Sequence, residues 1–274
     1  MIMKNIFKET AITESITRFT MPGNVFTYLI EGSEKAVLID TGYGLGPFRQ
    51  FIEEKLNGKP YTLILTHGHF DHAGGASQFD EVWMNYNDLN LAARHTQKEI
   101  RFNSLKNEFP DLNMDELDDP KADGYLDLKY GQKFDIGNEI LEIVNIGGHT
   151  PGSIGILFHN QRILLAGDAC CSFTLMFGGS DSLSIREYRD NLINLWNTYQ
   201  YDFDTVLYSH PHNIGGPEVI PQMIELCDEI LQGKDDHIES ASLFGTSYIA
   251  KKVEWGKGRP DGKIANLQYS ADCL

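Results

Sequence analysis

Apolar residues along the first half of the chain come in short runs that end at turn-forming residues. This pattern is typical of strands that alternate with helices. Four runs rich in β-formers predict strands over residues 25–31, 36–40, 61–65 and 82–84. Between them, residues 47–56 carry apolar side chains at helical spacing and stop at Asn57-Gly58, which predicts a helix. A long polar helix is expected over residues 87–106.

The acidic stretch 108–123 has two prolines and little periodicity, so we expect a surface insertion there, serving as a lid or as a solvated loop. The second half again places strands before helices, with strands predicted over residues 139–146, 154–158, 162–166 and 205–208. Amphipathic helices are predicted over 185–199 and 219–231. The tail from 244 to 268 is expected to form two strands around a turn at 256–262.

No repeat array or low-complexity linker interrupts this pattern. We therefore predict a single domain over residues 1–274, with a helical or loop insertion at 85–125 and a strand-rich tail at 240–274. A chain of 274 residues that is 41% hydrophobic has ample material for a core. No run approaches the roughly 18 to 20 apolar residues of a membrane span, and the first residues lack the apolar run of a secretory signal. We expect a cytoplasmic protein.

Charge narrows the range of partners. The chain has 23 Lys and Arg against 39 Asp and Glu, a formal net charge of −16. Such a balance disfavours nucleic acid, because phosphate binding relies on neutralisation by Lys and Arg. We expect a small-molecule substrate and neither a nucleic-acid nor a membrane partner. The insertion and the apolar tail could support a homodimer.

The segment THGHFDHAGG, residues 66–75, concentrates metal-ligand side chains. His67 and His69 follow a predicted strand two residues apart, so in extended geometry they project to the same side. Asp71 and His72 come next, where the glycine-rich continuation allows the backbone to turn. Four ligand-type side chains within six residues can serve two neighbouring ions, and imidazole with carboxylate suits zinc, iron or manganese.

Three further ligand-type residues each follow an apolar strand. His149 lies in GGHTPGS after LEIVNIGG, Asp168 follows RILLAG, and His210 follows TVLYS. Ligands at strand ends are what a site assembled at one edge of a sheet requires. Each of these residues alone is weak evidence, but as an ordered set they favour a metal centre.

The order HxHxDH, GHTPGS, GD and a strand-terminal His resembles the metallo-β-lactamase superfamily, with a ligand set closest to its glyoxalase II, lactonase and ribonuclease Z members. The upstream YLIEGSEKAVLIDTG is similar to that family's opening strands, and the likeness runs from about residue 25 to 210. It implies an α/β fold, the αββα four-layer sandwich, in which two mixed β-sheets are flanked by helices and the metals lie at one edge.

The resemblance also implies a role for each ligand position. The first ion would be held by His67, His69 and His149. The second ion would be held by Asp71, His72 and His210. Asp168 would bridge both ions, and an aspartate matching Asp40 would support a ligand histidine from behind, a sound role for a carboxylate on the far ring nitrogen.

Two divalent ions, with zinc favoured and iron or manganese also accepted by such ligands, would share a water acidified to a bridging hydroxide. The resemblance thus implies a dinuclear metallo-hydrolase of a small ester, thioester or lactone, in which Asp71 would assist proton transfer. A β-lactam or phosphodiester hydrolase is less favoured. β-Lactamases of the family often place a thiolate where Asp168 stands and lack a match to His72, and a phosphodiesterase of the ribonuclease Z type conflicts with the net charge.

Particular residues also weigh against three activities found elsewhere in the superfamily. Di-iron redox proteins have a glutamate at the position of His69. Glyoxalase II carries a basic segment where this chain has CCSFTLMFGGSDS, and lactonases have a tyrosine at the position of Cys171. A non-catalytic metal-binding or sensor module belongs to a different class of function, but all seven ligand positions are filled, which favours an enzyme.

Two residues are candidates to approach the substrate, namely Cys171 and His212. The remaining histidines are interpreted as surface residues or supports of ligands: His95, His159 and His237. The four cysteines lack the spacing of a zinc ribbon or a disulfide framework: Cys170, Cys171, Cys227 and Cys273. Cys170 and Cys171 follow Asp168 closely enough to line a pocket, and we expect them to pack there rather than act as nucleophiles.

Overall fold

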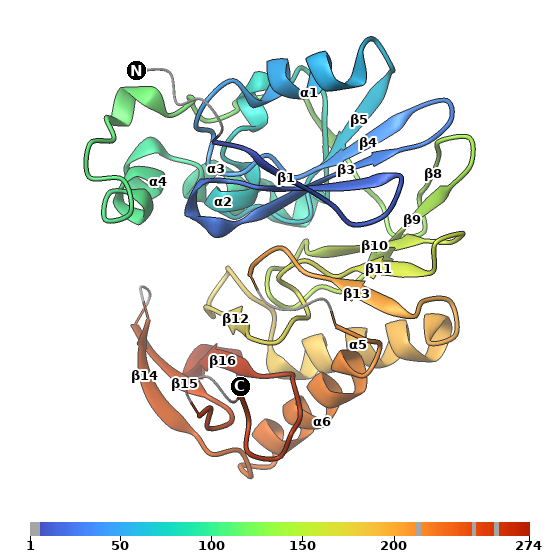
Figure 1. Ribbon diagram of the computed structural model, residues 1–274. Coiled ribbons are helices and arrows are strands. Elements are labelled where there is room, and N and C mark those ends of the chain that lie inside the picture. The colour runs from blue at the N-terminus through green and yellow to red at the C-terminus, as the bar shows by residue number, and fades with distance from the viewer. Residues whose placement is uncertain (1–5, 212–214, 243–244, 255–257) are drawn as a thin grey trace. The chain divides into compact units, whose positions relative to one another are not determined.

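The first half of the chain builds a seven-stranded mixed sheet in the order β1-β2-β3-β4-β5-β6-β7 (Figure 1). Strands β1 to β4 pair antiparallel, whereas β4 to β7 pair parallel. The strands are β1 (Lys8–Ala11), β2 (Ile16–Thr20), β3 (Phe26–Glu31), β4 (Ala36–Ile39), β5 (Tyr61–Ile64), β6 (Val82–Met84) and β7 (Tyr125–Asp127). The four strands predicted in this half are therefore β3 to β6.

The structure, a computed structural model, describes residues 6–211, 215–242, 245–254 and 258–274. The chain divides into two units. The first comprises the residues up to Leu141 together with Ser209–Pro211, and the second comprises the others from Glu142 onward. The boundary falls inside a strand rather than in a linker, and the expectation of a single domain stays a prediction.

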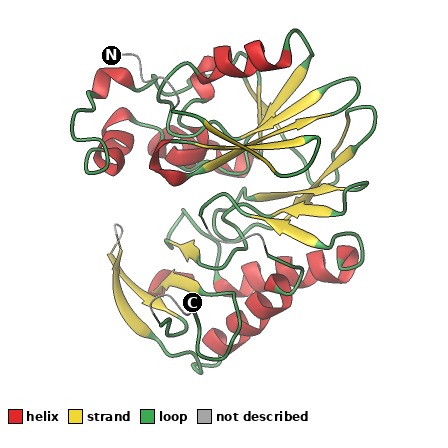
Figure 2. Cartoon of the chain, viewed as in Figure 1, coloured by secondary structure: helices red, strands yellow, loops and turns green. Residues whose placement is uncertain are grey.

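Helix α1 (Phe48–Leu56) covers one face of the first sheet, where its buried Phe48, Ile52 and Leu56 share a core with Leu38 and Leu63 of the strands. The remaining helical segments of this unit are short (Figure 2). They are η1 (Pro22–Asn24), α2 (Phe70–Ala73), η2 (Ala76–Gln78), η3 (Tyr86–Asp88), α3 (Leu89–His95), α4 (Lys98–Leu105) and η4 (Met114–Glu116).

The prediction of one long helix over residues 87–106 is wrong, because α3 and α4 are separate helices. Gln97 is extended, with φ −60° and ψ 141°, and breaks the helical path between them. The carbonyl of Thr96, which lies at this break, accepts a hydrogen bond from Nε of Arg101 at 2.8 Å. A buried side chain thus stabilises an interruption that the polar pattern could not reveal.

The acidic stretch 108–123 is irregular, as expected, but it is anchored to the rest of its unit. Leu117 is buried and forms a bridge with Leu45, and the amide of Asp118 donates to the carbonyl of Gly44 at 2.9 Å. The side chain of Gln78 donates to the Asp118 carboxylate at 2.6 Å. This end of the insertion is therefore a packed segment and not a solvated loop.

The second half contains a five-stranded sheet in the order β13-β11-β10-β9-β8 and a four-stranded sheet in the order β12-β16-β15-β14. The five strands are β8 (Lys133–Asp135), β9 (Ile140–Asn145), β10 (Ile154–Phe158), β11 (Ile163–Leu165) and β13 (Thr205–Leu207). The four strands are β12 (Thr174–Met176), β14 (Ile238–Ser242), β15 (Gly245–Ile249) and β16 (Leu267–Ser270). The short η5 (Ala271–Cys273) follows β16.

Helices α5 (Ile185–Tyr199) and α6 (Val219–Leu231) pack on each other and share one core with strand residues such as Leu157, Leu164 and Val206. A capping box of Ser184 and Glu187 starts α5, which explains its sharp beginning. Both helices match the two amphipathic segments predicted from periodicity. Among the described residues, no helix has the length and apolar character that a bilayer crossing requires.

The two strands predicted around a turn in the tail are β15 and β16, which pair antiparallel, and β14 is a further strand before them. β14 and β15 pair antiparallel with Ser242 opposite Gly245, and the connection from β15 to β16 spans the region where the turn was expected. In its described part, Arg259 forms an ion pair with Asp261 at 2.5 Å, and Gly262 has φ +76°. The ion pair between Arg259 and Asp261 stabilises this connection, and the periodicity of the strands cannot predict it.

Candidate metal centre

The THGHFDHAGG segment leaves the carboxyl end of β5, a strand in the parallel part of the first sheet. It runs extended to His69, which precedes the first residue of α2. Three histidines of the segment are almost fully inaccessible to solvent: His67, His69 and His72. Burial of three imidazoles in one short segment is costly unless each ring nitrogen is engaged, which favours a binding role.

The first pair of ring nitrogens lies at the start of this segment. Nε2 of His67 and Nδ1 of His69 are 3.0 Å apart, and the rings meet edge to face. On its other side, Nδ1 of His67 lies 3.0 Å from Oγ1 of Thr66. His67 is thus oriented so that Nε2 is the nitrogen directed toward His69.

A second group of donors comprises Asp71, His72 and His210, whose ligand atoms lie within 4.8 Å of one another. Oδ2 of Asp71 lies 3.3 Å from Nε2 of His210 and 3.7 Å from Nε2 of His72. His210 joins this unit because the carbonyl of Ser209 accepts a hydrogen bond from the amide of Phe26, at the start of β3, at 2.7 Å.

These separations fit metal coordination. Two donors bound to one ion at the usual Zn–N distance of about 2.0–2.1 Å stand about 3.3 Å apart when the geometry is tetrahedral. The pair His67 and His69, at 3.0 Å, and the pair Asp71 and His210, at 3.3 Å, are close to that value. Imidazole and carboxylate donors with this spacing are ligands typical of zinc, iron or manganese.

Asp40 supports the second group of donors. Its Oδ2 accepts from Nδ1 of His72 at 2.8 Å, while Oδ1 accepts from the amide of Thr66 at 2.8 Å. The carboxylate is an acceptor, so Nδ1 carries the proton and Nε2 keeps its lone pair for an ion. Asp40 has φ +63°, a strained value for a residue with a side chain, and this turn after β4 brings the carboxylate beneath His72.

Asp40→Asn is expected to raise the dissociation constant for zinc by about 10–100-fold, the usual effect of losing a carboxylate behind a ligand histidine. Competition with a chromophoric chelator measures this constant. Glu142→Gln is the matched control, because Glu142 bonds His159 at the same 2.8 Å in the second unit. Equal affinities for the Asp40 variant and the control would contradict the supporting role.

A close approach of two loops explains the glycines that end the segment. A Cβ on Gly74 would lie 2.5 Å from the carbonyl oxygen of Phe70 and 2.7 Å from the backbone of Tyr43. The amide of Gly75 donates to Oγ1 of Thr41 at 3.1 Å, and the hydroxyl of Thr41 donates to the carbonyl of His72 at 2.8 Å. Only glycine allows the loop after β4 to hold the ligand segment at this distance.

The second unit contributes His149 and Asp168. Nδ1 of His149 donates to the carbonyl of Leu175 in β12 at 2.5 Å, which leaves Nε2 as the donor for an ion. Nε2 lies 3.9 Å from Oδ2 of Asp168. A Cβ on Gly148 would lie 2.0 Å from the ring of Tyr188, so the glycine before His149 is required by packing.

Five of the seven predicted ligands therefore lie in the first unit and two in the second. Within the first unit, the structure brings together the imidazoles of His67 and His69, and separately the side chains of Asp71, His72 and His210. Within the second unit, it brings His149 near Asp168.

Cys171, predicted as a candidate substrate contact, is buried in the second unit. Its Sγ lies 3.6 Å from Oγ1 of Thr174, and burial raises the pKa of its thiol to about 12. Burial also raises the pKa of Cys170, and no disulfide joins the two residues. The expectation that these cysteines pack rather than react agrees with this environment. His212, the other candidate, lies outside the described residues.

Native protein is expected to resist iodoacetamide at pH 8. A thiol with a pKa of about 12 is almost entirely protonated at pH 8, where only about 10⁻⁴ of Cys171 would be thiolate. Mass spectrometry of intact protein before and after unfolding in denaturant checks this. Rapid labelling of Cys171 in the native protein would show that the thiol is activated and accessible.

The remaining predicted histidines have structural partners. His95 is buried on α3, and its ring stacks on that of His69 with centroids 5.1 Å apart. His159 pairs with Glu142, and His237 stacks on Tyr248. His95 therefore supports a predicted ligand, whereas His159 and His237 pack within the second unit.

Sequence reasoning missed two charged residues beside the ligand segment, Asp88 and Arg101, both fully buried. They lie in a stretch whose polar pattern predicts an exposed helix. The sequence gives no direct signal for them, because a charged residue at the start of α3 and another in α4 are both ordinary on a helix surface. Their burial depends on where α3 and α4 pack, which local sequence does not specify.

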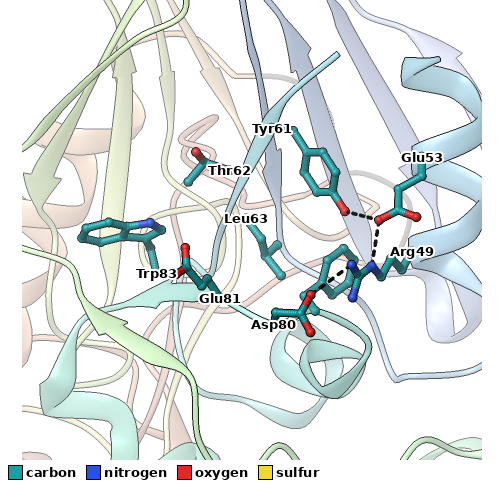
Figure 3. A pocket seen from close by; sticks show the side chains of 9 residues that line it. Arg49, Glu53, Tyr61, Thr62, Leu63, Asp80, Glu81 and Trp83 are labelled. Atoms are coloured by element: carbon teal, nitrogen blue, oxygen red, sulfur yellow. Dashed lines mark hydrogen bonds and ion pairs between the residues drawn. The ribbon is translucent and has the colours of Figure 1, made fainter. Parts of the chain in front are cut away.

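A cavity of about 380 Å³ lies in the same unit, away from the ligands (Figure 3). It is lined in part by Tyr61, where β5 begins, whereas the ligand segment follows the end of β5. Arg49 spans its wall through ion pairs with Glu53 at 2.7 Å and Asp80 at 3.1 Å. Burial, followed by the charge of Glu53, raises the pKa of Tyr61 to about 12. Arg49 thus pairs with two carboxylates of the lining, and none of the predicted ligands lines the cavity.

Comparison with known proteins identifies the family. The family model described as the metallo-beta-lactamase superfamily matches residues 20–197, more than half of the chain. The chain belongs to this superfamily. The resemblance inferred from HxHxDH, GHTPGS and the terminal His is confirmed, and the His and Asp groups described above are sites that could hold a metal in a member of it.

Two relatives within the superfamily are named hydrolases. The human acyl-coenzyme A thioesterase MBLAC2 is 29% identical over 168 residues, which cover 55% of this chain and 60% of the relative. The hydroxyacylglutathione hydrolase GloC of Haemophilus influenzae is 31% identical over 142 residues, which cover 51% of this chain and 64% of the relative. The matches span less than two thirds of these relatives' own length.

Solved structures confirm the fold class. A metallo-beta-lactamase from Pontibacter korlensis superimposes with a TM-score of 0.57 at 21% identity, covering 81% of this chain and 99% of that protein. The predicted α/β fold of the superfamily, with mixed sheets flanked by helices, is therefore confirmed. At this identity the likeness concerns the fold alone.

Proposed function

We propose that this chain is a metal-dependent hydrolase that cleaves a small ester, thioester or lactone with the help of two divalent ions, zinc being favoured. The observation that carries the proposal is the donor group of the buried His72 with Asp71 and the partly buried His210, whose spacing fits coordination. His67 and His69 supply a second set of donors in the same unit. By the order of the family's motifs, we assign His149 to the ion of His67 and His69, and Asp168 to a bridging role.

When bound, such ions would acidify a water molecule and polarise the carbonyl that it attacks. The chain's own residues prepare the donors for this task. Asp40 keeps the proton of His72 on Nδ1, and the carbonyl of Leu175 does the same for His149. Oδ2 of Asp71 faces the two imidazoles, so we assign any proton transfer by this residue to its other oxygen.

Thioesters are the substrate class to test first. One relative is named an acyl-coenzyme A thioesterase and the other a hydroxyacylglutathione hydrolase, and both names denote thioester substrates. A thioester carbonyl is an electrophile suited to attack by an activated water. The net charge of −16 weighs against polyanionic substrates. We therefore propose a small thioester with few phosphate groups, and we propose neither nucleic acid nor a membrane as partner.

A panel of one thioester, one lactone, one phosphodiester and one β-lactam tests this proposal. Each compound is assayed with zinc-loaded protein, with chelator, and after zinc is restored to the chelated protein. Turnover of the thioester or the lactone that chelator stops and zinc restores is the expected result. A protein that holds two ions per chain and turns over none of the four would overturn the hydrolase assignment.

A further inference from the structure

We propose that residues 85–118 form a brace that fixes the ligand segment 66–75, with Asp88 and Arg101 as its positioning residues. The brace begins after β6. Its far end is anchored by the β-bridge between Leu117 and Leu45 and by the hydrogen bond from the amide of Asp118 to the carbonyl of Gly44. The inference rests on the proposed metal site, because the segment it fixes is the one that carries four of the assigned ligands.

Asp88 fixes the beginning of the ligand segment. Its side chain is fully buried, and Oδ2 accepts a hydrogen bond from the amide of Gly68 at 2.9 Å. Gly68 is the residue between His67 and His69, so this hydrogen bond sets the orientation of the backbone between the two histidines. A Cβ on Gly68 would lie 2.9 Å from the carbonyl oxygen of Asp88 and 3.0 Å from the amide of Ala92. The start of α3 is therefore in close contact with this peptide.

Arg101 fixes the end of the segment. Its guanidinium is fully buried and donates through Nη1 to the carbonyls of Gly74 at 3.0 Å and Tyr43 at 2.9 Å. Nη2 donates to the carbonyl of Asp118 at 2.5 Å. Burial lowers the pKa of Arg101, and the charges of Asp118 and Asp119 oppose this effect.

The bonds of Arg101 join several loops at one point. With Nε on the carbonyl of Thr96, its guanidinium connects the loop after β4, the end of the ligand segment, the break between α3 and α4, and the anchored residues near 118. The planar fork of arginine can donate in several fixed directions at once, which lysine cannot do. A buried charge that bonds several carbonyls is costly to place, which favours a positioning role.

The two fixed points lie on either side of the ligands His69, Asp71 and His72. The ring of His95, from the same brace, stacks on His69 between these points. A lid that opened over this site would have to break the Asp88 and Arg101 bonds and the Leu117 packing together. The geometry therefore assigns this part of the insertion to holding ligands in place, a preorganisation that raises metal affinity.

Zinc affinity of variants at Asp88, at Arg101 and in the core tests the brace. Asp88→Ala removes the acceptor for the Gly68 amide and is expected to raise the zinc dissociation constant by about 10–100-fold. Asp88→Asn keeps an acceptor oxygen at that place and is expected to stay within a few-fold of the unmodified protein. Ile52→Val, at a core position of α1, lowers stability without removing a hydrogen bond to the segment and is expected to bind zinc normally.

The measurements are competition with a chromophoric chelator and the visible absorption spectrum of the Co²⁺-loaded protein. The spectrum reports ligand geometry, so a shift in Asp88→Ala that Asp88→Asn reverses would support the brace independently of activity. Arg101→Lys, which keeps the charge but loses the fork, is expected to change affinity and spectrum in the same direction. It provides the test if Asp88→Ala does not fold.

The outcomes separate the brace from the function on which it rests. Unmodified protein that binds no zinc would overturn the proposed function, and the brace with it. Unmodified protein that binds zinc, with Asp88→Ala and Arg101→Lys binding equally well and showing unchanged Co²⁺ spectra, would overturn the brace alone. A loss of affinity in Ile52→Val as large as in Asp88→Ala would also overturn it, because the effect would then follow stability and not the bond to Gly68.

Discussion

His67→Ala is expected to lower kcat/KM for the preferred substrate by about 10³-fold, while the protein remains folded. The substitution removes the Nε2 donor that lies 3.0 Å from His69 and leaves the first ion with fewer ligands. A metal ion contributes several kcal/mol to stabilising the transition state, and about 1.4 kcal/mol corresponds to a factor of ten in rate. Steady-state kinetics with a thioester substrate measures the loss.

His159→Ala is the matched control for this experiment. His159 is also a histidine bonded to a neighbour, but its partner is Glu142 in the second unit, and it is not among the predicted ligands. It is expected to keep its full rate. Full activity in His67→Ala would contradict the assignment of this residue to the metal centre.

Removal of metal by chelator is expected to lower the thermal midpoint of unfolding by about 10 °C or more. At free zinc about 100 times the dissociation constant, each bound ion stabilises the native state by about 2.7 kcal/mol, so two ions contribute about 5 kcal/mol. In a chain of this size, about 1 kcal/mol shifts the midpoint by about 2–4 °C. Scanning calorimetry or the near-ultraviolet signal, with and without chelator, measures the shift.

Asp71→Ala is the control variant for this experiment, because it removes the carboxylate that faces His72 and His210. Its midpoint is expected to fall less on chelation, because fewer bonds to metal are lost. Restored zinc should raise the midpoint of the unmodified protein to its starting value. A midpoint that chelator leaves unchanged would mean that the buried histidines are stable without an ion.

Much of the fold could be predicted from local patterns. The first four residues of the run AVLID become β4, and the apolar spacing of Phe48, Ile52 and Leu56 becomes the buried face of α1. β4 is buried along its whole length and α1 along one face, so the periodicity of their apolar residues is enough to predict them. β1, with the sequence KETA and four exposed residues, has no such pattern and is stabilised by pairing with β2, which local sequence does not show.

The donor segment was visible in the sequence for a different reason. Ligands such as His67, His69 and His72 lie within six residues, so their grouping does not depend on tertiary contacts. Asp88 and Arg101 act on the same segment from a helical stretch that looks solvated, and their role follows from packing alone. The prediction of ligands therefore depended on local chemistry, while the supports of those ligands required the structure.

Equilibrium zinc content, measured by elemental mass spectrometry, tests whether these residues bind two ions. Unmodified protein, His67→Ala and His210→Ala are each equilibrated with a small excess of zinc and freed of unbound metal. We expect about two ions per chain in the unmodified protein and about one in each variant, with the folded signal retained. An unmodified protein that holds no zinc, iron or manganese, or variants that hold as much metal as it does, would contradict the assignment of these histidines to two metal ions.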